Sequence, residues 1–290
     1  MNTISDVLSL LAQPFIQRAF LVGILIAVMS SLLGVFIVLK RLSLIGDGLS
    51  HTAFGGLSLG YYLGVVPLWA AAVVVVLGAL GITKATRSRR ISGDAAVAVI
   101  LQLGLASGIV LLSLSRGFGV NIDSLLFGSI LLVDATQVLV ATVVLVFVAA
   151  VVVVYYRELQ YTAFDDAQAR AAGVNTTFLD YLLSVLAGVV VIASIPIVGV
   201  LLISAMLVLP ALMSIQVSRS FKGTLLLSPV FGVISVGLGM FFSIVIDSAS
   251  GATIVLTAIL VFLVIMGLKR ITGTKVTASR SISGVVAGTV

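Results

Sequence analysis

The sequence predicts an all-α membrane protein, a polytopic bundle of about nine (eight to nine) transmembrane helices. Hydrophobic residues make up 61% of the 290-residue chain, charged residues only 9%, and the mean hydropathy is +1.33. A soluble domain of this length could not bury so much apolar surface, so the bilayer must solvate most of it. The chain has no cysteine, which excludes disulfides and thiolate metal sites.

Charges, glycines and prolines divide the apolar sequence into nine segments that can cross a hydrocarbon layer of about 30 Å. A shorter run, 125–133, is expected to be interfacial or re-entrant and to lead to Asp134, the predicted N-cap of the fifth span. Ile195 and Pro196 are expected to separate the sixth span from the seventh. The predicted spans are about 19–39, 44–63, 67–83, 95–114, 135–156, 178–195, 198–216, 224–246 and 252–268.

Lysine and arginine fall almost entirely on one side of this map. Of the 16 basic residues, only Arg18 and Arg116 lie on the other side. Because retained positive charge marks the cytoplasmic side, we expect a multi-pass protein of a bacterial-type cell (inner or plasma) membrane. Its N-terminus would lie outside and its C-terminus in the cytoplasm. The formal net charge of +6 is then a topology signal, and no nucleic-acid partner is expected.

The second predicted span contains the most unusual polar residues. Asp47 is the only carboxylate well inside a predicted span, and His51 is the only histidine in the chain. They are four residues apart, so they share one helix face. An oxygen and a nitrogen donor on one face form half of a site for zinc, manganese or iron, and ionisable groups in a bilayer usually face a water-filled path.

Two other interpretations of these residues stay open. A buried, hydrogen-bonded Asp–His pair could hold two helices in register, or the pair could belong to a proton relay. As a metal site, two ligands are too few, although a second copy of the chain across a two-fold axis would double them.

Four blocks of the sequence resemble the metal-specific ABC importer permeases for zinc, manganese or iron(II). The resemblance covers roughly residues 14–269, and Asp47 and His51 match the positions that coordinate metal in the channel of that family. In the fourth block Ala249 and Ser250 stand where the family often has a proline. The four blocks are residues 32–51, 127–130, 198–211 and 247–255.

This resemblance implies the ABC importer permease fold and a divalent transition metal (zinc, manganese or iron) as the transported substrate, with no permanently bound cofactor. It implies a second permease copy in the lipid bilayer, most simply a homodimer. Two cytoplasmic ATPase subunits and an extracellular or periplasmic metal-binding protein complete the expected assembly. Residues 1–271 would form the permease domain and residues 272–290 a flexible cytoplasmic tail.

The chain has no Gly-x-x-x-x-Gly-Lys-[Ser/Thr] phosphate loop, so it is expected to be a transport subunit and not an enzyme, with ATP hydrolysed by a separate partner. Loop 157–177 is the longest polar stretch between spans. Within it, Asp165 or Asp166 is the expected N-cap of a short helix that ends before Gly173. This segment resembles the ATPase-docking helix of the family, and an ordinary surface helix is the alternative. The resemblance assigns docking to Phe164, Asp165, Ala169, Arg170 and Gly173.

Asp247, at the outer end of the eighth span, is a candidate for the outer gate, and the N-cap of the ninth helix is its alternative role. The competing function is a secondary metal cation transporter or channel in which Asp47 and His51 relay ions. Coupled carriers usually contain several buried ionisable residues, whereas this chain has one such pair. An intramembrane enzyme is disfavoured because no second histidine or cysteine could complete a catalytic zinc site.

Overall fold

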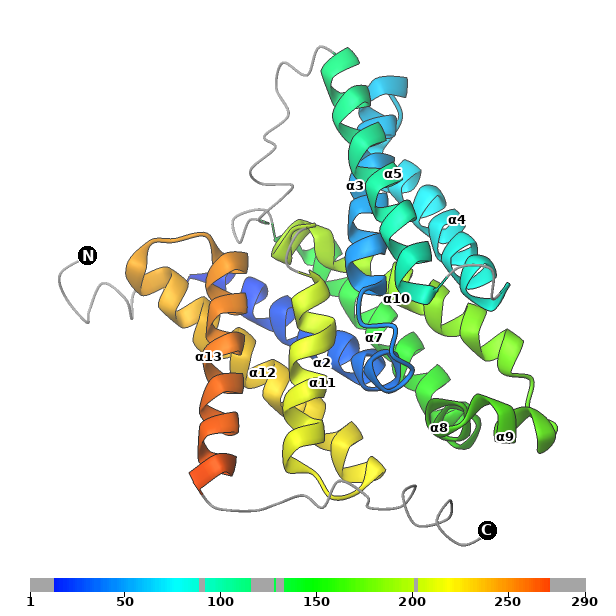
Figure 1. The fold of residues 1–290 in the computed structure, drawn as a ribbon. Helices are drawn as coiled ribbons and strands as arrows, with labels where there is room; N and C mark the ends of the chain where they lie inside the picture. Colours follow the sequence, from blue (N-terminus) through cyan, green and yellow to red (C-terminus); the bar gives the residue numbers. More distant parts are fainter. Residues whose placement is uncertain (1–12, 89–91, 116–127, 129–132, 201–202, 272–290) are drawn as a thin grey trace, which may run out of the picture.

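The computed structural model describes residues 13–88, 92–115, 128, 133–200 and 203–271. The described residues form eleven helices and no strand (Figure 1). The helices are α2 (Pro14–Leu39), α3 (Ile45–Leu63), α4 (Pro67–Arg87), α5 (Gly93–Leu114), α7 (Ala135–Val154), α8 (Tyr156–Phe164), α9 (Asp166–Ala171), α10 (Thr176–Val198), α11 (Ile203–Val217), α12 (Phe221–Ile246) and α13 (Ser250–Ile271).

The all-helical prediction is confirmed, but the count of nine spans is not. In the described part of the chain, seven helices are long and apolar enough to cross a membrane, namely α2, α4, α5, α7, α10, α12 and α13. The other two predicted spans coincide with α3, whose glycine, serine, aspartate and histidine dilute its hydropathy, and with α11, which has only 15 residues. Each of the nine predicted segments therefore overlaps a helix, while length and hydropathy alone support seven crossings.

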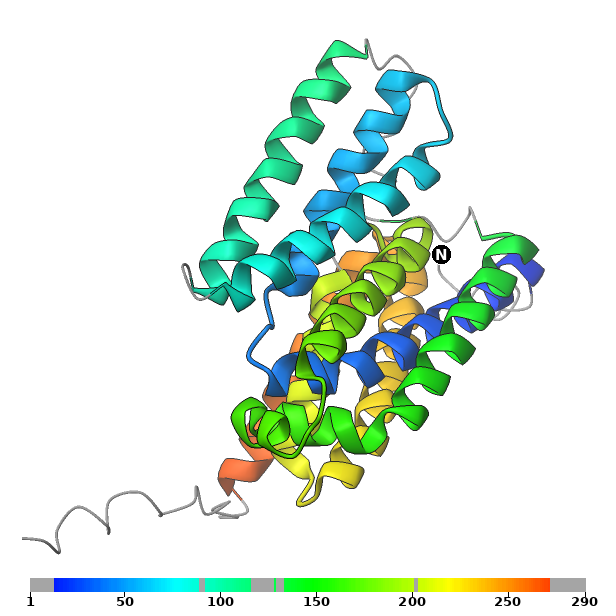
Figure 2. The same ribbon diagram turned by 90° about the vertical axis from the view of Figure 1, so that its right-hand side faces the viewer.

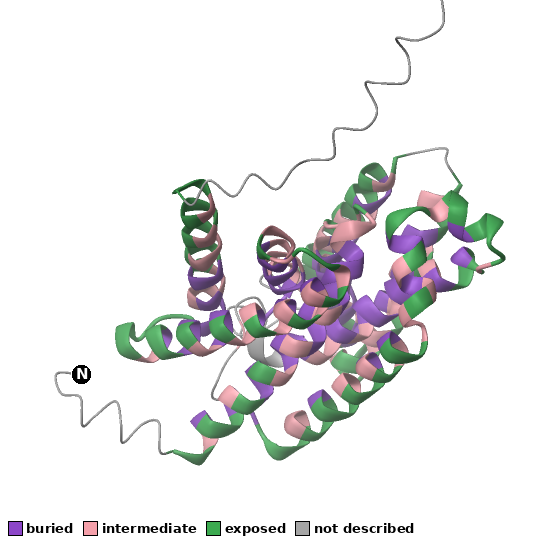
Figure 3. Cartoon of the chain, turned by 90° about the horizontal axis from the view of Figure 1, so that it is seen from below, coloured by how far each residue is buried: buried purple, intermediate pink, exposed green. Residues whose placement is uncertain are grey.

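Helix α2 lies at the centre of the bundle and is the most buried of the candidate spans. Small residues let its neighbours approach closely, as expected where helices pack without a hydrophobic driving force. A Cβ atom at Gly34 would lie 1.8 Å from the carbonyl oxygen of Leu207 in α11. On another side, the Ser228 hydroxyl of α12 donates to the Ser31 carbonyl of α2 at 3.0 Å. Figure 3 shows the buried residues gathered in this central region.

Helices α3, α4 and α5 form a group that projects from the rest of the bundle (Figures 1 and 2). Glycines on α3 set the spacing inside this group. A Cβ at Gly55 would lie 2.8 Å from the Gly104 carbonyl oxygen of α5, and one at Gly56 would lie 2.6 Å from the Ala71 Cα of α4. Both neighbours are backbone atoms that cannot move aside, so α3 can fit between α4 and α5 only with glycine at these positions.

Two local predictions have clear outcomes. Asp134 is the N-cap of α7 as predicted, since its Oδ1 accepts a hydrogen bond from the Gln137 backbone N–H at 3.0 Å. The Gln137 side-chain oxygen in turn accepts a hydrogen bond from the Asp134 backbone N–H.

The predicted break between the sixth and seventh spans is wrong in position, because α10 continues past Pro196 to Val198 and ends at Gly199. Gly199 has φ +81°, a conformation that glycine adopts without strain, so the chain turns there.

Some predictions fall outside the described residues. These are the tail 272–290, the block 127–130 apart from Gly128, and the interfacial run 125–133 apart from Gly128 and Val133.

Candidate functional site

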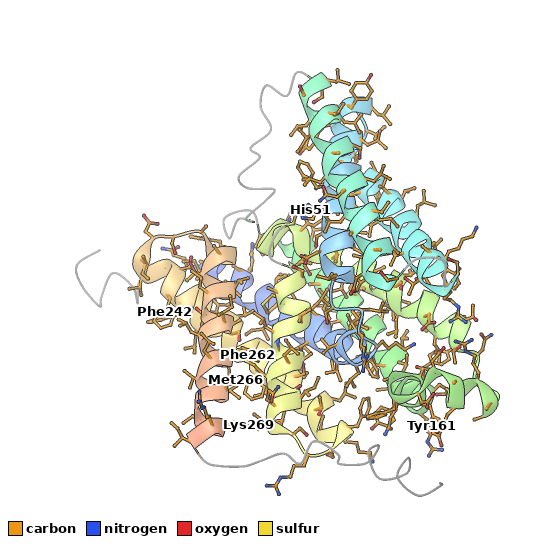
Figure 4. All side chains as sticks on the ribbon, viewed as in Figure 1. His51, Tyr161, Phe242, Phe262, Met266 and Lys269 are labelled. Atoms are coloured by element: carbon orange, nitrogen blue, oxygen red, sulfur yellow. The ribbon has the colours of Figure 1, made fainter. Side chains whose placement is uncertain are left out.

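Asp47 and His51 both lie on α3, with Asp47 in the first turn of that helix, and both side chains are half-buried. Figure 4 shows His51 on the edge of α3 that faces away from α4 in that view. Within the part of the chain that the structure describes, neither side chain makes a hydrogen bond or an ion pair. The structure therefore contains no hydrogen bond between Asp47 and His51 among its described residues.

The remaining faces of α3 are occupied by neighbouring helices, which fix its rotation. A Cβ at Gly48 would lie 2.8 Å from the Val97 side chain of α5, and one at Gly46 would lie 3.1 Å from the Ser204 Cα of α11. A Cβ at Gly104 of α5 would lie 2.6 Å from the carbonyl oxygen of His51 itself. The backbone that carries the imidazole is thus held at a glycine contact with α5.

Among the described residues, no group of three or more His, Cys, Asp or Glu side chains is placed to hold a metal ion. Transition metals take four or more donors, so Asp47 and His51 by themselves could supply only part of a coordination shell. Hydroxyl or carbonyl oxygens, water or a second chain would have to supply the other donors.

Asp247 is exposed at the end of α12, where it is the C-cap in the left-handed region with φ 54° and ψ 54°. Its backbone N–H donates to the Ser243 carbonyl. The alternative that it N-caps the ninth helix is wrong, because α13 begins at Ser250, three residues later. An Asp side chain tolerates this conformation better than most, which accounts for its place at the turn.

The predicted short helix of loop 157–177 is present as α9. Asp165 is its N-cap, and its Oδ1 accepts hydrogen bonds from the N–H groups of Ala167 at 2.9 Å and Gln168 at 3.0 Å. Gly173 follows the end of the helix with φ +85°. These two residues shape the segment, as the sequence predicts.

The other docking candidates divide into one buried and two exposed side chains. Ala169 is fully buried and packs the helix inward, whereas Phe164 is 66% exposed and Arg170 is exposed. Arg170 pairs with Asp166 one turn earlier. Partial burial acts to raise the pKa of Asp166, but the hydrogen bond and charge of Arg170 outweigh it and lower that pKa below its ordinary value. Phe164 and Arg170 are therefore the candidates that a partner could touch directly.

Comparison with known proteins decides the family. The profile of the ABC 3 transport family matches residues 12–269. The chain belongs to the ABC 3 transport family. Together with the seven apolar helices among its described residues, this membership makes it a multi-pass membrane protein.

Two curated relatives of this ABC 3 chain are similar over nearly their whole length. The manganese transport system membrane protein MntC of Halalkalibacterium halodurans is 34% identical over 253 residues, 87% of each chain. The manganese import system permease protein ScaB of Streptococcus gordonii is 33% identical over 250 residues, 86% of this chain and 90% of the relative. Among solved structures, PsaBC from Streptococcus pneumoniae in complex with Fab matches with a TM-score of 0.81 and 31% identity, over 91% of this chain and 95% of that chain.

An ionic cluster at one end of the ABC 3 bundle was not predicted from the sequence. Asp180, in the first turns of α10, pairs with Lys40 after α2 and with Arg87 at the end of α4. Arg87 also donates to the Thr177 hydroxyl at 2.6 Å. The side chains of Lys40, Asp180 and Arg87 are only 8%, 18% and 22% exposed. A cavity of about 270 Å³ adjoins the cluster.

Sequence reasoning missed this cluster for a simple reason. Asp180 lies two residues after the predicted start of the sixth span at residue 178, and the sequence pattern gives it no partner. Its partners lie 140 and 93 residues earlier, in separate loops of the predicted map. The signal available in the sequence was a carboxylate just inside a predicted span, at the same predicted membrane side as most of the basic residues.

A second unpredicted feature links the docking segment to the core. The Phe221 ring at the start of α12 contacts Phe164 with ring centroids 5.8 Å apart. It also contacts Tyr156 of α8 and Phe36 of α2, each with centroids 5.7 Å apart. Phe221 therefore joins α8 to both α2 and α12 through aromatic contacts.

Removal of Asp180 should destabilise the ABC 3 bundle. In Asp180→Ala, Lys40 and Arg87 lose their acidic partner in a mostly buried place, which we expect to lower the free energy of unfolding by about 3 kcal/mol. The matched control is Asp166→Ala, which breaks the more exposed pair with Arg170 and should cost at most about 1 kcal/mol. Thermal denaturation of the two purified variants measures the difference, and equal losses would contradict the importance of the cluster.

Proposed function

We propose that this chain is the membrane permease of an ATP-driven importer for a divalent transition metal, with manganese as the favoured cargo. The observation that carries the proposal is the unpartnered pair of Asp47 and His51 on the polar helix α3 of an ABC 3 family member. Both named relatives above are manganese transporters, which favours manganese. An oxygen and nitrogen donor set also suits zinc and iron, so the pair by itself does not select among them.

The proposal includes a topology in which α3 and α11 also cross the membrane. The ion pairs of Asp180 support it, because they bring the end of α2, the end of α4 and the start of α10 to the same end of the bundle. Between the end of α2 and the end of α4 the chain contains only α3 and α4. If α4 crosses the bilayer to reach this end, α3 must cross it in the opposite direction. The contact of Phe221 with Phe36 likewise supports two crossings, α10 and α11, between Asp180 and the start of α12.

In this topology the end with α8, α9 and most basic residues is cytoplasmic, and the C-terminus lies on that side. The opposite end carries the exposed aromatic residues Tyr62 and Trp69, which suit a membrane–water interface. Asp247 lies at the outer end of α12, where we assign it to the outer gate. The assembly comprises a second permease copy, two cytoplasmic ATPase subunits and an outer metal-binding protein.

In the proposed mechanism, α3 binds the metal ion and the α8–α9 segment binds the ATPase subunits. The Asp47 carboxylate offsets part of the charge of a metal ion that gives up its hydration water, and the neutral His51 imidazole provides a nitrogen donor. ATPase subunits bind the α8–α9 segment at Phe164 and Arg170, while Asp165, Ala169 and Gly173 hold its shape. Movement of the α8–α9 segment is transmitted to α2 and α12 by the ring contacts of Phe221 with Phe164 and Phe36.

Reconstitution tests this function against the alternative of a secondary transporter. Vesicles containing the permease, its ATPase and the outer binding protein should take up manganese only when ATP is supplied. Manganese, zinc and iron(II) are measured side by side to establish the cargo. Uptake that follows a proton gradient and does not need ATP would contradict the proposal and favour a carrier with an Asp/His relay.

The docking assignment makes a separate prediction. Phe164→Ala combined with Arg170→Ala should lower ATP-driven uptake by about 10-fold or more, since exposed anchors of this kind each contribute about 1–2 kcal/mol to an interface. Both side chains are exposed, so the melting temperature of the permease should fall only slightly, through loss of the ring contact of Phe164 with Phe221 and of the pair of Arg170 with Asp166.

The matched control for this double variant is Ile271→Ala, which removes an apolar side chain that is 82% exposed at the end of α13. It should retain uptake. Unchanged ATP-driven uptake in the double variant would rule out the docking role.

A further inference from the structure

The hydroxyl of Ser50 on α3 differs from the hydroxyls of Thr52 and Ser58 on the same helix in its hydrogen bonding. Serine and threonine inside apolar helices usually donate to a carbonyl one turn earlier, which satisfies the hydroxyl locally. On α3, Thr52 donates to the Gly48 carbonyl at 2.6 Å and Ser58 donates to the Phe54 carbonyl at 2.9 Å. Ser50 is only 2% exposed, yet its Oγ has no hydrogen-bond partner in the described part of the chain. A buried hydroxyl without a partner is unfavourable, so the Ser50 hydroxyl is a candidate to bind a ligand.

Ser50 lies next to the two residues of the candidate metal path. With about 100° between successive residues of a helix, Ser50 is displaced by about 60° from Asp47 on one side, and His51 by about 40° on the other. The three residues therefore form one continuous polar arc on α3. Asp47 and Ser50 are three residues apart, which places their side chains as neighbours on the helix surface.

The glycine contacts of α3 show which neighbouring helices lie on either side of this polar arc. Gly46, one turn before Ser50, meets the backbone of Ser204 in α11, where an added Cβ would lie 3.1 Å from the Ser204 Cα. Gly55, on a different face, meets Gly104 of α5. By its position on the helix, Ser50 thus lies between the α11 contact and Asp47, at the end of the polar arc nearer α11.

We propose that the Ser50 hydroxyl is a further contact for the transported cation and that it influences which metal passes. This inference rests on the proposed function, because it assumes that the cation passes Asp47 and His51. A neutral hydroxyl oxygen suits hard cations such as manganese(II) and adds no charge to the site. It also supplies one of the donors that the pair lacks within the described residues.

A change from oxygen to sulfur at this position tests the proposal. Ser50→Cys keeps the size of the side chain but replaces a hard donor with a soft one, and the natural chain has no other cysteine. In reconstituted vesicles we expect the ratio of cadmium to manganese uptake to rise by about 10-fold. The matched control is Thr52→Cys, since the Thr52 hydroxyl is satisfied by the Gly48 carbonyl and the side chain lies against Gly78 of α4, about 140° around the helix from Asp47. It should leave the ratio unchanged.

A second measurement does not depend on transport. Cadmium at saturating concentration should slow alkylation of the thiol introduced by Ser50→Cys in the purified permease, as followed by mass spectrometry, and should not slow that of Thr52→Cys. An unchanged metal ratio, or no protection by cadmium, would overturn the role of Ser50. If Asp47→Asn and His51→Gln variants still transport normally, the proposed path itself fails, and that outcome is distinguishable from failure at Ser50 alone.

Discussion

Asp47→Asn and His51→Gln should each lower ATP-driven manganese uptake by about 10-fold or more, which corresponds to about 1.4 kcal/mol or more, because the first removes the charge of an oxygen donor and the second removes the nitrogen donor. Asparagine keeps the shape of the aspartate but loses the charge that offsets dehydration of the ion. Glutamine keeps a polar group but removes the imidazole nitrogen. Neither native side chain makes a hydrogen bond or an ion pair in the described part of the chain, so the fold should lose little stability.

The measurement is initial uptake as a function of manganese concentration, together with the melting temperature of each variant. Thr52→Ser is the control on the same helix, because the Thr52 hydroxyl donates to the Gly48 carbonyl of its own backbone and its methyl group lies against Gly78 of α4. Uptake near the wild-type rate in both variants, at unchanged protein stability, would remove Asp47 and His51 from the path.

Gly34→Ala should be the most destabilising single methyl substitution in the bundle. The added Cβ would lie 1.8 Å from the Leu207 carbonyl oxygen, and 2.9 Å from the carbonyl carbon, so α2 and α11 would have to separate. Overpacking typically costs about 1–3 kcal/mol, and a clash with backbone should reach the top of that range or exceed it. Because Leu207 also contacts Gly46 on α3, the displacement should reach the helix that carries Asp47.

Gly237→Ala is the matched control for this substitution. A Cβ at Gly237 of α12 would meet no atom within 4 Å, so alanine should be neutral or should stabilise the helix by up to about 1 kcal/mol. Thermal denaturation of the two variants in the same detergent gives the comparison. Equal melting temperatures would contradict the tight packing of α2 against α11.

Much of the fold was predictable because each helix that crosses a bilayer requires a long apolar segment, which can be recognised in the sequence. Apolar runs bounded by charges located the helices, and the capping preference of Asp134 marked the start of α7. The break near Pro196 was placed too early because proline was given more weight than Gly199. The missing N–H of proline costs one hydrogen bond, whereas the backbone actually turns where glycine takes a positive φ.

The candidate site was only partly predictable. Scarcity singled out Asp47 and His51, since a lone histidine four residues after a carboxylate in an apolar run is unusual. The ion pairs of Asp180 and the ring contacts of Phe221 join residues far apart in the chain, and nothing in local sequence specifies such partners. Ser50 could not be told from Thr52 or Ser58 by sequence, because only the rotamer shows that its hydroxyl has no partner among the described residues.

The central claim is that the transported metal is bound by the imidazole of His51. Because His51 is the only histidine of the chain, coupling between bound manganese and an imidazole nitrogen in the purified permease reports on this one residue. Pulsed electron paramagnetic resonance of the manganese-loaded permease, without its partner proteins, measures that coupling. The account predicts a histidine nitrogen signal in the wild type and its loss in His51→Gln. Bound manganese without that signal in the wild type, or an unchanged signal in the variant, would contradict it.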